Sequence, residues 1–245
     1  MPAEPATPAA TYISAAIPPG SIDYYVALMT PARLRELTRT GIALAKVIRN
    51  VAMQPGEPQI RQLKLHWFAQ EVEMVIAGTP RHPLTAELLR LCPHERWPES
   101  MRELVQAMMT EAAQPPATAL QELLPAAHRA ATQQALLAAV MPTSGKTSID
   151  AAGSLGTGIA LARFVRDHGA GPPDVRDLPR LAHEHFSAAD LSLRHEAMPV
   201  YLQGALYRRQ LRRLEAAGYN ADKAALSPLA LLWHSWREAR KLLRP

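Results

Sequence analysis

The chain has 245 residues and a formal net charge of +5; 48% of its residues are hydrophobic but only 5% are aromatic. Its single cysteine, Cys92, excludes an intrachain disulfide, and no apolar run reaches the roughly 18 residues that span a bilayer. The modest basic excess allows an acidic partner. Nucleic-acid binding would rest on charge alone, and we expect no nucleic acid partner.

Composition also predicts the fold class. The sequence is rich in alanine and leucine and has no alternating valine or isoleucine run, which predicts an all-α fold. No linker divides it into halves that could each bury a core, so we expect one domain over residues 21–245. Residues 1–20 combine proline and alanine without a basic start or a continuous apolar core. We expect a disordered N-terminal lead-in there.

Capping signals and prolines predict the helices in chain order. Ser21 or Asp23 can cap a short helix that ends at Met29, and the Thr-Pro pair at residues 30–31 starts a longer helix to about Val51. We expect later helices over residues 98–113, after the break at Pro115-Pro116 to about Val140 with a kink near Gln121 caused by Pro125, and over residues 148–167, 199–216 and 228 onward.

The helix over residues 60–77 carries two apolar stripes. They consist of Ile60, Leu63, Trp67 and Met74, and of Leu65, Phe68, Val72, Val75 and Ile76. A helix that is apolar over so much of its circumference is normally surrounded by other helices, so we expect it to be central, with Trp67 largely buried. Replacing Trp67 with alanine would then cost about 3–5 kcal/mol. Gly78 fits the left-handed residue that closes this helix, and Pro83 can open the next one.

Two segments of this region resemble a known family. Lys64-Leu-His-Trp-Phe-Ala-Gln-Glu71 is followed by Ala77-Gly-Thr-Pro-Arg-His-Pro83. The squalene/phytoene synthase family typically shows a basic-Leu-Gln-Trp-Trp run and then Gly-x-Pro-x-His-Pro, in a similar order and spacing. The resemblance implies an all-α, isoprenoid-synthase-like helical bundle. It does not by itself imply catalysis.

The resemblance also raises the question of a metal site. Catalytic members carry an aspartate-rich motif on the early helix that corresponds to residues 31–51, where it holds magnesium against a diphosphate. This chain has no Asp or Glu between Glu36 and Glu57. Because magnesium takes oxygen ligands, usually including one or two carboxylates, this helix cannot supply them. We therefore expect no metal site and no catalytic residue, and magnesium as a cofactor only if the chain is a transferase after all.

The helix over residues 148–167 matches the family's second motif, Asn-x-x-Arg-Asp-x-x-x-Asp. Arg163 stands at the asparagine position, Arg166 and Asp167 form the Arg-Asp pair, and Gly171 occupies the place of the last aspartate. One carboxylate of this motif therefore remains. The chain also continues almost directly from here into Asp174-Val-Arg-Asp177, where catalytic relatives have a longer loop and a further helix.

Small residues on the same helix suggest a ligand site. Gly153, Gly156 and Gly158 each cost about 1 kcal/mol relative to alanine within a helix, which indicates either the close approach of another helix or a cavity for an apolar ligand. If the glycines line a cavity, we expect a ligand pocket beside residues 153–162. The candidate ligand-binding residues are Lys64, Glu71, Gly156, Arg163, Arg166 and Asp167, with Lys64, Arg163 and Arg166 at the mouth.

Histidine and arginine patterns near the C-terminus have ordinary explanations. His183 and His185, with His195 further on, lack the i and i+4 spacing of a zinc-binding helix, so we interpret them as structural or exposed. The helix over residues 199–216 carries four arginines, which indicate a solvated face or a surface for an anionic lipid or protein. These are Arg208, Arg209, Arg212 and Arg213.

The last helix has Ser227 as its cap and Pro228 as its first residue. Its apolar residues recur at helical spacing and are expected to seal the bundle. They are Leu229, Leu232, Trp233, Trp236 and Leu243. The pattern Pro-Leu-x-Leu-x-x-x-Ser-Trp-Arg at residues 228–237 resembles the branch of the family that contains the mitochondrial complex I assembly factor, as does the Asp-Val-Arg-Asp run at residues 174–177.

Two functions remain open from the sequence. The favoured hypothesis is a non-catalytic family member that holds an isoprenoid-like lipid or diphosphate, or a partner protein of a respiratory complex. It would be cytoplasmic or peripheral to the inner membrane, or in the mitochondrial matrix of a eukaryote. The alternative is a transferase that condenses isoprenyl diphosphates in squalene, phytoene or hopanoid biosynthesis.

Overall fold

The computed structural model describes residues 7–93, 96–113, 120–139, 146–168, 177–195 and 197–243. Within these ranges all regular secondary structure is helical and there is no strand, which confirms the all-α prediction. The helices are α1 (Pro8–Ala16), α2 (Ile22–Met29), α3 (Ala32–Met53), α4 (Pro58–Ile76), α5 (Pro83–Leu91), α6 (Trp97–Ala113), α7 (Leu120–Ala139), α8 (Lys146–His168), α9 (Leu178–Ala188), α10 (Met198–Ala216), α11 (Ala221–Ala224) and α12 (Pro228–Leu242), with a 3-10 turn, η2, at Leu191–Leu193. Among these residues no helix is both long and apolar enough to cross a bilayer.

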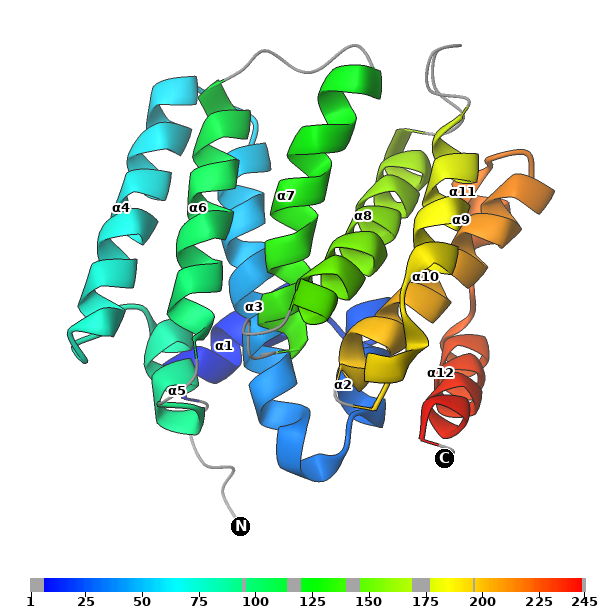
Figure 1. Ribbon diagram of the computed structural model, residues 1–245, viewed down its shortest axis with the longest axis horizontal. Helices are drawn as coiled ribbons and strands as arrows, with labels where there is room; N and C mark the ends of the chain where they lie inside the picture. The colour runs from blue at the N-terminus through cyan, green and yellow to red at the C-terminus, as the bar shows by residue number, and fades with distance from the viewer. Residues whose placement is uncertain are drawn as a thin grey trace.

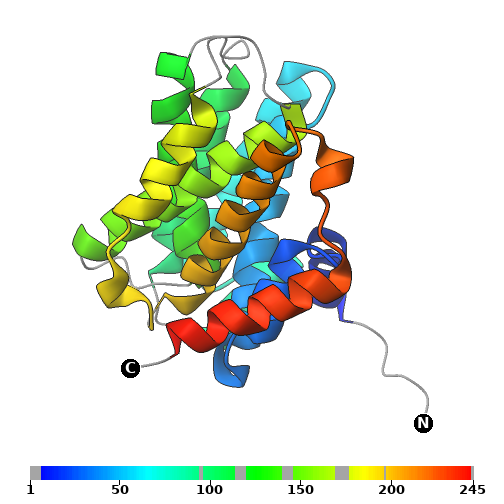
Figure 2. The ribbon, with the colours of Figure 1, turned by 90° about the vertical axis from the view of Figure 1, so that its right-hand side faces the viewer.

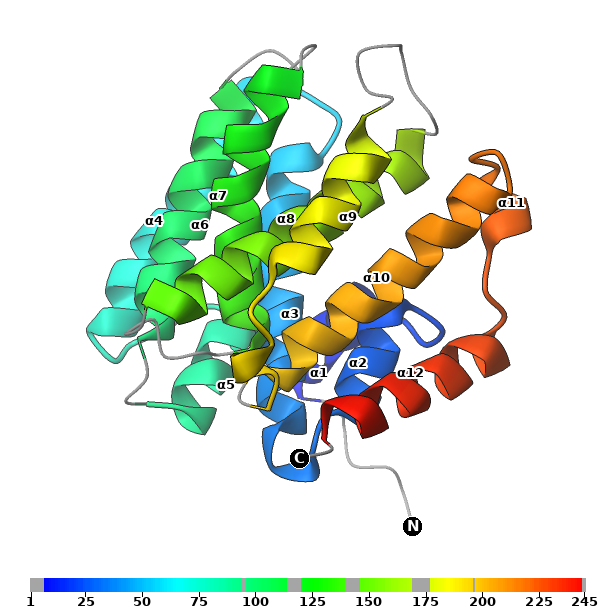
Figure 3. The ribbon, with the colours of Figure 1, turned by 45° about the vertical axis from the view of Figure 1, so that its right-hand side comes forward.

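Helix α3 runs through the middle of the bundle. It packs against α1, α2, α4, α5, α6 and α7, and Figure 1 shows it behind and between the longer helices. Helix α8 organises the other half, where it contacts α7, α9 and α10, and Figure 3 shows α8, α9 and α10 running side by side. The core therefore lies between α3, α7, α8 and α10, and the interior side chains of these helices define the candidate site.

Several helix ends are where the sequence predicts them. The Ser21 hydroxyl accepts a hydrogen bond from the amide of Tyr24 at 3.1 Å, and the Ser227 hydroxyl accepts one from the amide of Ala230 at 3.2 Å. Gly78 has φ of +76° after α4. Side-chain capping and a left-handed glycine satisfy backbone groups that a helix end leaves open.

The N-terminal segment differs from the prediction. Residues 8–16 form α1, which begins with Thr7 as its cap and packs against α3 and α5. Ala9 and Ile13 are buried there. The disordered lead-in is therefore wrong for this part of residues 1–20, while residues 1–6 lie outside the described ranges. Alanine is a good helix former, and two buried apolar side chains one turn apart are enough to dock a short helix.

Helix α4 is peripheral, not central as predicted. It lies at one edge of the bundle in Figure 1 and packs against α6, α3 and α5. Leu65, Phe68, Val72 and Val75 of the second stripe are buried, but its last residue, Ile76, is 55% exposed. In the first stripe, Leu63 is 72% exposed and Trp67 is 40% exposed. The prediction that Trp67 is largely buried is wrong. Periodicity measures the width of an apolar face, but it does not tell how much of that face the neighbours cover.

Helix α12 also departs from the prediction. It lies across the outside of the bundle (Figure 2) and packs against α10 and α2. Its buried residues are Leu231, Ser235 and Ala239. The five residues expected to seal the bundle are instead exposed: Leu229, Leu232, Trp233, Trp236 and Leu243. Small side chains let the helix approach closely and turn its larger apolar residues outward.

The glycines of α8 serve close packing. A Cβ atom on Gly156 would lie 2.3 Å from the carbonyl oxygen of Ala131 on α7, and one on Gly158 would lie 2.8 Å from the ring of Phe186 on α9. Of the two explanations for the small residues, the structure supports the close approach of neighbouring helices.

We expect two leucines of α4 to differ sharply in their contribution to stability. Leu65→Ala should lower the free energy of unfolding by about 2–5 kcal/mol because Leu65 is fully buried. Leu63→Ala should change it by at most about 0.5 kcal/mol because Leu63 faces solvent. Urea denaturation followed by circular dichroism measures both, and equal losses would contradict the orientation of α4.

Gly156→Ala should destabilise the protein although alanine is the better helix former by about 1 kcal/mol. The added methyl group meets a backbone carbonyl, which cannot move without displacing α7, and such overpacking typically costs about 1–3 kcal/mol. Gly158→Ala is the matched control, because the Phe186 ring can shift. An increase in the urea midpoint for Gly156→Ala would contradict the close contact.

Candidate functional site

A group of polar side chains occupies the interior between α2, α3, α7, α8 and α10. We call it the central polar cluster: Asp23, Lys46, Gln134, Arg163, Gln203 and Tyr207. It includes Arg163, the first matched position of the family's second motif. It is therefore the place to test what chemistry the chain retains.

Asp23 is the anion of the cluster and is 1% exposed. Its carboxylate lies 2.7 Å from the ammonium of Lys46 and 3.6 Å from the guanidinium of Arg163. It also accepts a hydrogen bond from Gln203 Nε2 at 2.5 Å. Ser21 caps α2, so Asp23 in the first turn is free to point inward and join three helices.

Arg163 is the central cation, and its guanidinium is shared among several partners. Its Nε donates to the hydroxyl of Tyr207 at 2.9 Å, and its Nη1 donates to Gln134 Oε1 at 3.5 Å. The guanidinium carbon also lies 4.8 Å from the centroid of the Tyr207 ring, a cation–π distance. Asp23 lies on the remaining side, so the Arg163 guanidinium is surrounded by partners from the protein itself.

The cluster keeps both of its principal charges. Burial by itself would raise the pKa of Asp23, but Arg163 and Lys46 outweigh it, so the pKa is lowered. Burial would likewise lower the pKa of Arg163, but Tyr207 and Asp23 outweigh it, so the pKa is raised. The carboxylate and the guanidinium are therefore both ionised in the folded protein.

Two more charged residues lie at the side of the cluster. Burial and the nearby charge of Arg163 lower the pKa of Arg49 on α3, against the attraction of Glu111 and Asp167. Burial also raises the pKa of Glu111 on α6, against the attraction of Arg49. The inner face of α3 thus presents Lys46 and Arg49, in the stretch where the family resemblance implies carboxylates.

Arg166 and Asp167, the Arg-Asp pair of the second motif, form an ion pair with each other. Arg166 Nε lies 2.7 Å from Asp167 Oδ1, and Arg166 Nη2 donates to Asp167 Oδ2 at 3.1 Å. Burial would lower the pKa of Arg166, but this hydrogen-bonded contact outweighs it and the pKa is raised. The surviving motif carboxylate is therefore engaged by its own neighbour, near the partly exposed end of α8.

The interior beside α8 holds a cavity of about 20 Å³. Its lining includes Lys46, Gly156, Arg163 and Gln203. A cavity of this volume has room for about one water molecule. Gly156 and Arg163 do line a space beside residues 153–162, as the sequence suggests, but that space is much too small for an isoprenoid chain.

Lys64 and Glu71 lie elsewhere, on the peripheral helix α4. Lys64 is exposed and donates to the side chain of Gln54 at 3.0 Å. Glu71 is buried, and its Oε1 accepts hydrogen bonds from the amides of Arg81 and His82, each at 2.9 Å, and from the Thr85 hydroxyl. The structure therefore does not bring these two residues together with Arg163. Glu71 fixes the turn between α4 and α5.

The carboxylates of the described residues do not form a magnesium site. Within the described ranges, no group of three or more His, Cys, Asp or Glu side chains could hold a metal ion. Asp23 is bonded to two cations and Asp167 to a third. His183 contacts Glu215 at 3.0 Å across α9 and α10, while Gly171 and Asp174 lie outside the described residues. The residues that the structure describes thus do not fit the metal that the family resemblance implies.

Asp23 is the functional residue that the sequence did not assign to the site. Its position at the start of α2 predicts only a helix-capping role. The signal available in the sequence was its setting, because Ile22, Tyr25 and Val26 are all apolar and prove to be buried around it. A carboxylate on the inward face of such a helix needs an interior cation.

Comparisons with known proteins give the family. The family model for squalene/phytoene synthases matches residues 21–170, more than half of the chain. A crystal structure of a dehydrosqualene synthase in complex with ligand superposes with a TM-score of 0.73 over 96% of this chain and 95% of that chain, at 11% identity, which shows a shared fold. No curated protein matches significantly. With the fold and the motif segments in agreement with the family model, the chain belongs to the squalene/phytoene synthase family.

Proposed function

We propose that this chain is a non-catalytic member of its family. In this proposal the helical bundle holds a partner, either a protein of a respiratory complex or an isoprenoid-like lipid, and does not condense isoprenyl diphosphates. The carrying observation is the internal pairing of Asp23 with Lys46 and Arg163. Lys46 and Arg163 have the charge that could bind a diphosphate, but they already neutralise the buried carboxylate of Asp23.

The charge balance argues against diphosphate chemistry. When a diphosphate leaves an allylic carbon, negative charge builds on the leaving group and must be met by metal ions or fixed donors. A diphosphate that took Lys46 and Arg163 would leave Asp23 buried without its cations, and breaking a buried pair in this way typically costs about 3–5 kcal/mol. The cluster thus opposes the ligand that an active synthase needs.

Volume supports the same conclusion. Small-molecule sites usually occupy about 300–1,000 Å³, and the cavity at the cluster is about 20 Å³. The glycines that could have opened a channel beside α8 are in contact with α7 and α9. A partner would therefore be held on the outside of the bundle, which favours a partner protein over a lipid inside it. The likeness of residues 228–237 to the complex I assembly branch points to the same class of partner.

The transferase remains the alternative because the family includes synthases that act on isoprenyl diphosphates. It would require the interior to open and magnesium ligands to come from outside the described residues. The two functions predict opposite outcomes in one assay.

Purified protein should form no apolar product from radiolabelled farnesyl or geranylgeranyl diphosphate, with magnesium or manganese and NADPH present. The reason is that α3 has no carboxylates at its inner face and Asp167 is paired with Arg166. Solvent extraction and thin-layer chromatography measure the product against a no-protein control. Squalene, hydroxysqualene or phytoene above that control, and absent with Asp167→Ala, would restore the transferase.

If the cluster is structural, Asp23→Asn should lower the free energy of unfolding by about 3–5 kcal/mol, because Lys46 and Arg163 lose their anion in the interior. Asp167→Asn is the matched control. It removes a carboxylate whose side chain is 44% exposed, and it should cost no more than about 1 kcal/mol. Similar losses for the two variants would show that the interior pair is not what holds these helices.

The difference in stability between the parent and Asp23→Asn should depend on pH. The folded-state pKa of Asp23 is lowered, so its stabilising contribution is fully present above the unfolded value of about 3.9. That contribution is lost as pH falls through the lower folded-state pKa. Urea midpoints of the two proteins should therefore converge below about pH 4. A constant difference down to acidic pH would contradict the assignment.

A further inference from the structure

One face of α12 carries large side chains that the bundle does not cover. These side chains follow helical spacing and define the α12 outer face: Leu229, Leu232, Trp233, Trp236, Arg240 and Leu243. All six are exposed, and Leu229 is 78% exposed. The Trp233 and Trp236 rings stack with centroids 5.1 Å apart, and the guanidinium of Arg240 lies 4.8 Å above the Trp236 ring. An exposed apolar surface of this kind indicates a site where the protein contacts another protein or a membrane.

Positive charge borders the α12 outer face. Arg237 and Lys241 are exposed on the side of α12 next to it. The only carboxylate within α12, Glu238, is bonded to Lys241 at 2.9 Å and lies 3.7 Å from Arg237. Arg209 and Arg213 of α10 lie near His234 of α12: burial, Arg209 and Arg237 lower the pKa of His234, with a smaller effect of Arg213 in the same direction. The third side of α12, with Leu231 and its small neighbours, faces α10 and α2.

We propose that α12 binds to the surface of a bilayer that contains anionic lipids. The tryptophans and leucines would enter the boundary between headgroups and acyl chains, and Arg237, Arg240 and Lys241 would contact lipid phosphates. Amphipathic helices bind membranes with this combination of an apolar face and basic borders. Tryptophan in particular favours the interface, and long basic side chains can reach the headgroups while their stems stay in apolar surroundings.

The charges favour a membrane over a second copy of the chain. In a symmetric dimer the same patch would face itself, so Arg237, Arg240 and Lys241 would meet their own counterparts. Like charges brought together in an interface oppose association. An anionic lipid surface neutralises these charges instead. The inference concerns the outer surface alone and holds whether or not the interior catalyses a reaction.

The test is flotation of the purified full chain with lipid vesicles. The parent should float with vesicles of phosphatidylcholine and phosphatidylserine, less with phosphatidylcholine alone, and less again at high salt. Trp233→Ser with Trp236→Ser should weaken partitioning by about tenfold or more. Arg237→Gln with Lys241→Gln should remove the preference for phosphatidylserine.

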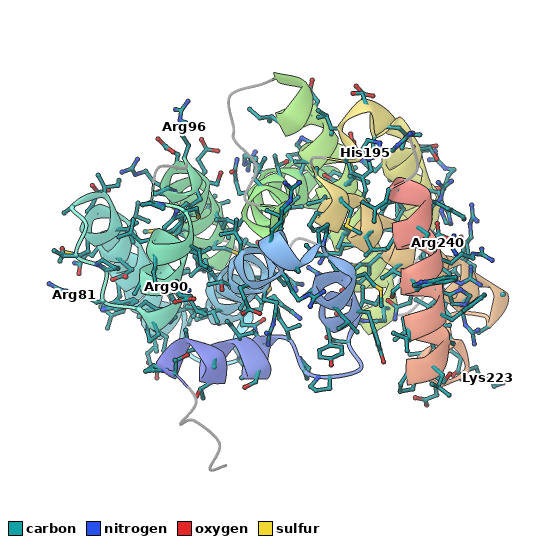
Figure 4. The ribbon with its side chains drawn as sticks, turned by 90° about the horizontal axis from the view of Figure 1, so that it is seen from below. Arg81, Arg90, Arg96, His195, Lys223 and Arg240 are labelled. Carbon is teal, nitrogen blue, oxygen red and sulfur yellow. The ribbon has the colours of Figure 1, made fainter. Side chains whose placement is uncertain are left out.

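Two matched controls remove equivalent groups from the far side of the molecule. Ile60→Ser with Leu63→Ser deletes exposed apolar side chains of α4. Arg81→Gln with Arg96→Gln deletes two charges that lie at the opposite end from Arg240 in Figure 4. Both double variants should bind vesicles as the parent does. Unfolding midpoints verify that all variants fold. If the tryptophan variant does not fold, the loss of the phosphatidylserine preference in Arg237→Gln with Lys241→Gln is the test of the proposal.

Any of the following vesicle results would overturn the proposal: no binding by the parent, equal binding of both vesicle types by the parent, unchanged binding by the α12 variants, or equal loss in the α4 control. A concentration-dependent dimer that the tryptophan variant abolishes, measured by light scattering, would assign the α12 outer face to a second copy of the chain and also exclude the membrane contact.

Discussion

The interior of this protein depends on one buried carboxylate. Asp23 on α2 holds Lys46 of α3, Arg163 of α8 and Gln203 of α10 together at a point where four helices meet. Arg163 is buried and Lys46 is partly buried, and two such cations side by side would repel each other where water screens them poorly. The carboxylate of Asp23 offsets that repulsion. The same carboxylate links α2 to the inward Lys46 of α3.

Local signals in the sequence predicted much of the fold. Ser21, Ser227, Gly78 and Pro83 mark helix ends because each acts on backbone groups within a few residues, and such effects do not depend on the rest of the chain. The fold class follows from composition and from the family motif. The glycines of α8 had two interpretations, close helix packing or a ligand cavity, and the contact between Gly156 and Ala131 favours close packing.

The predictions that failed concern what covers a helix. The two stripes of α4 and the Leu and Trp residues of α12 are apolar, but whether they face the core depends on neighbours that come from distant parts of the chain. The candidate site has the same limit. Gln203 reaches Asp23 across a sequence separation of 180 residues, and no local pattern encodes that pairing. The sequence could identify the motif position of Arg163, but not the partners that neutralise it.

The turn between α4 and α5 has a consequence for how such chains are classified. The motif that identifies the family includes Glu71 and His82, and here Glu71 binds backbone amides and the Thr85 hydroxyl while His82 caps α5 and contacts Trp67 and Phe68. These contacts fix the turn between α4 and α5. A chain can therefore carry the signature for reasons of packing alone, so that signature reports architecture and is silent on turnover.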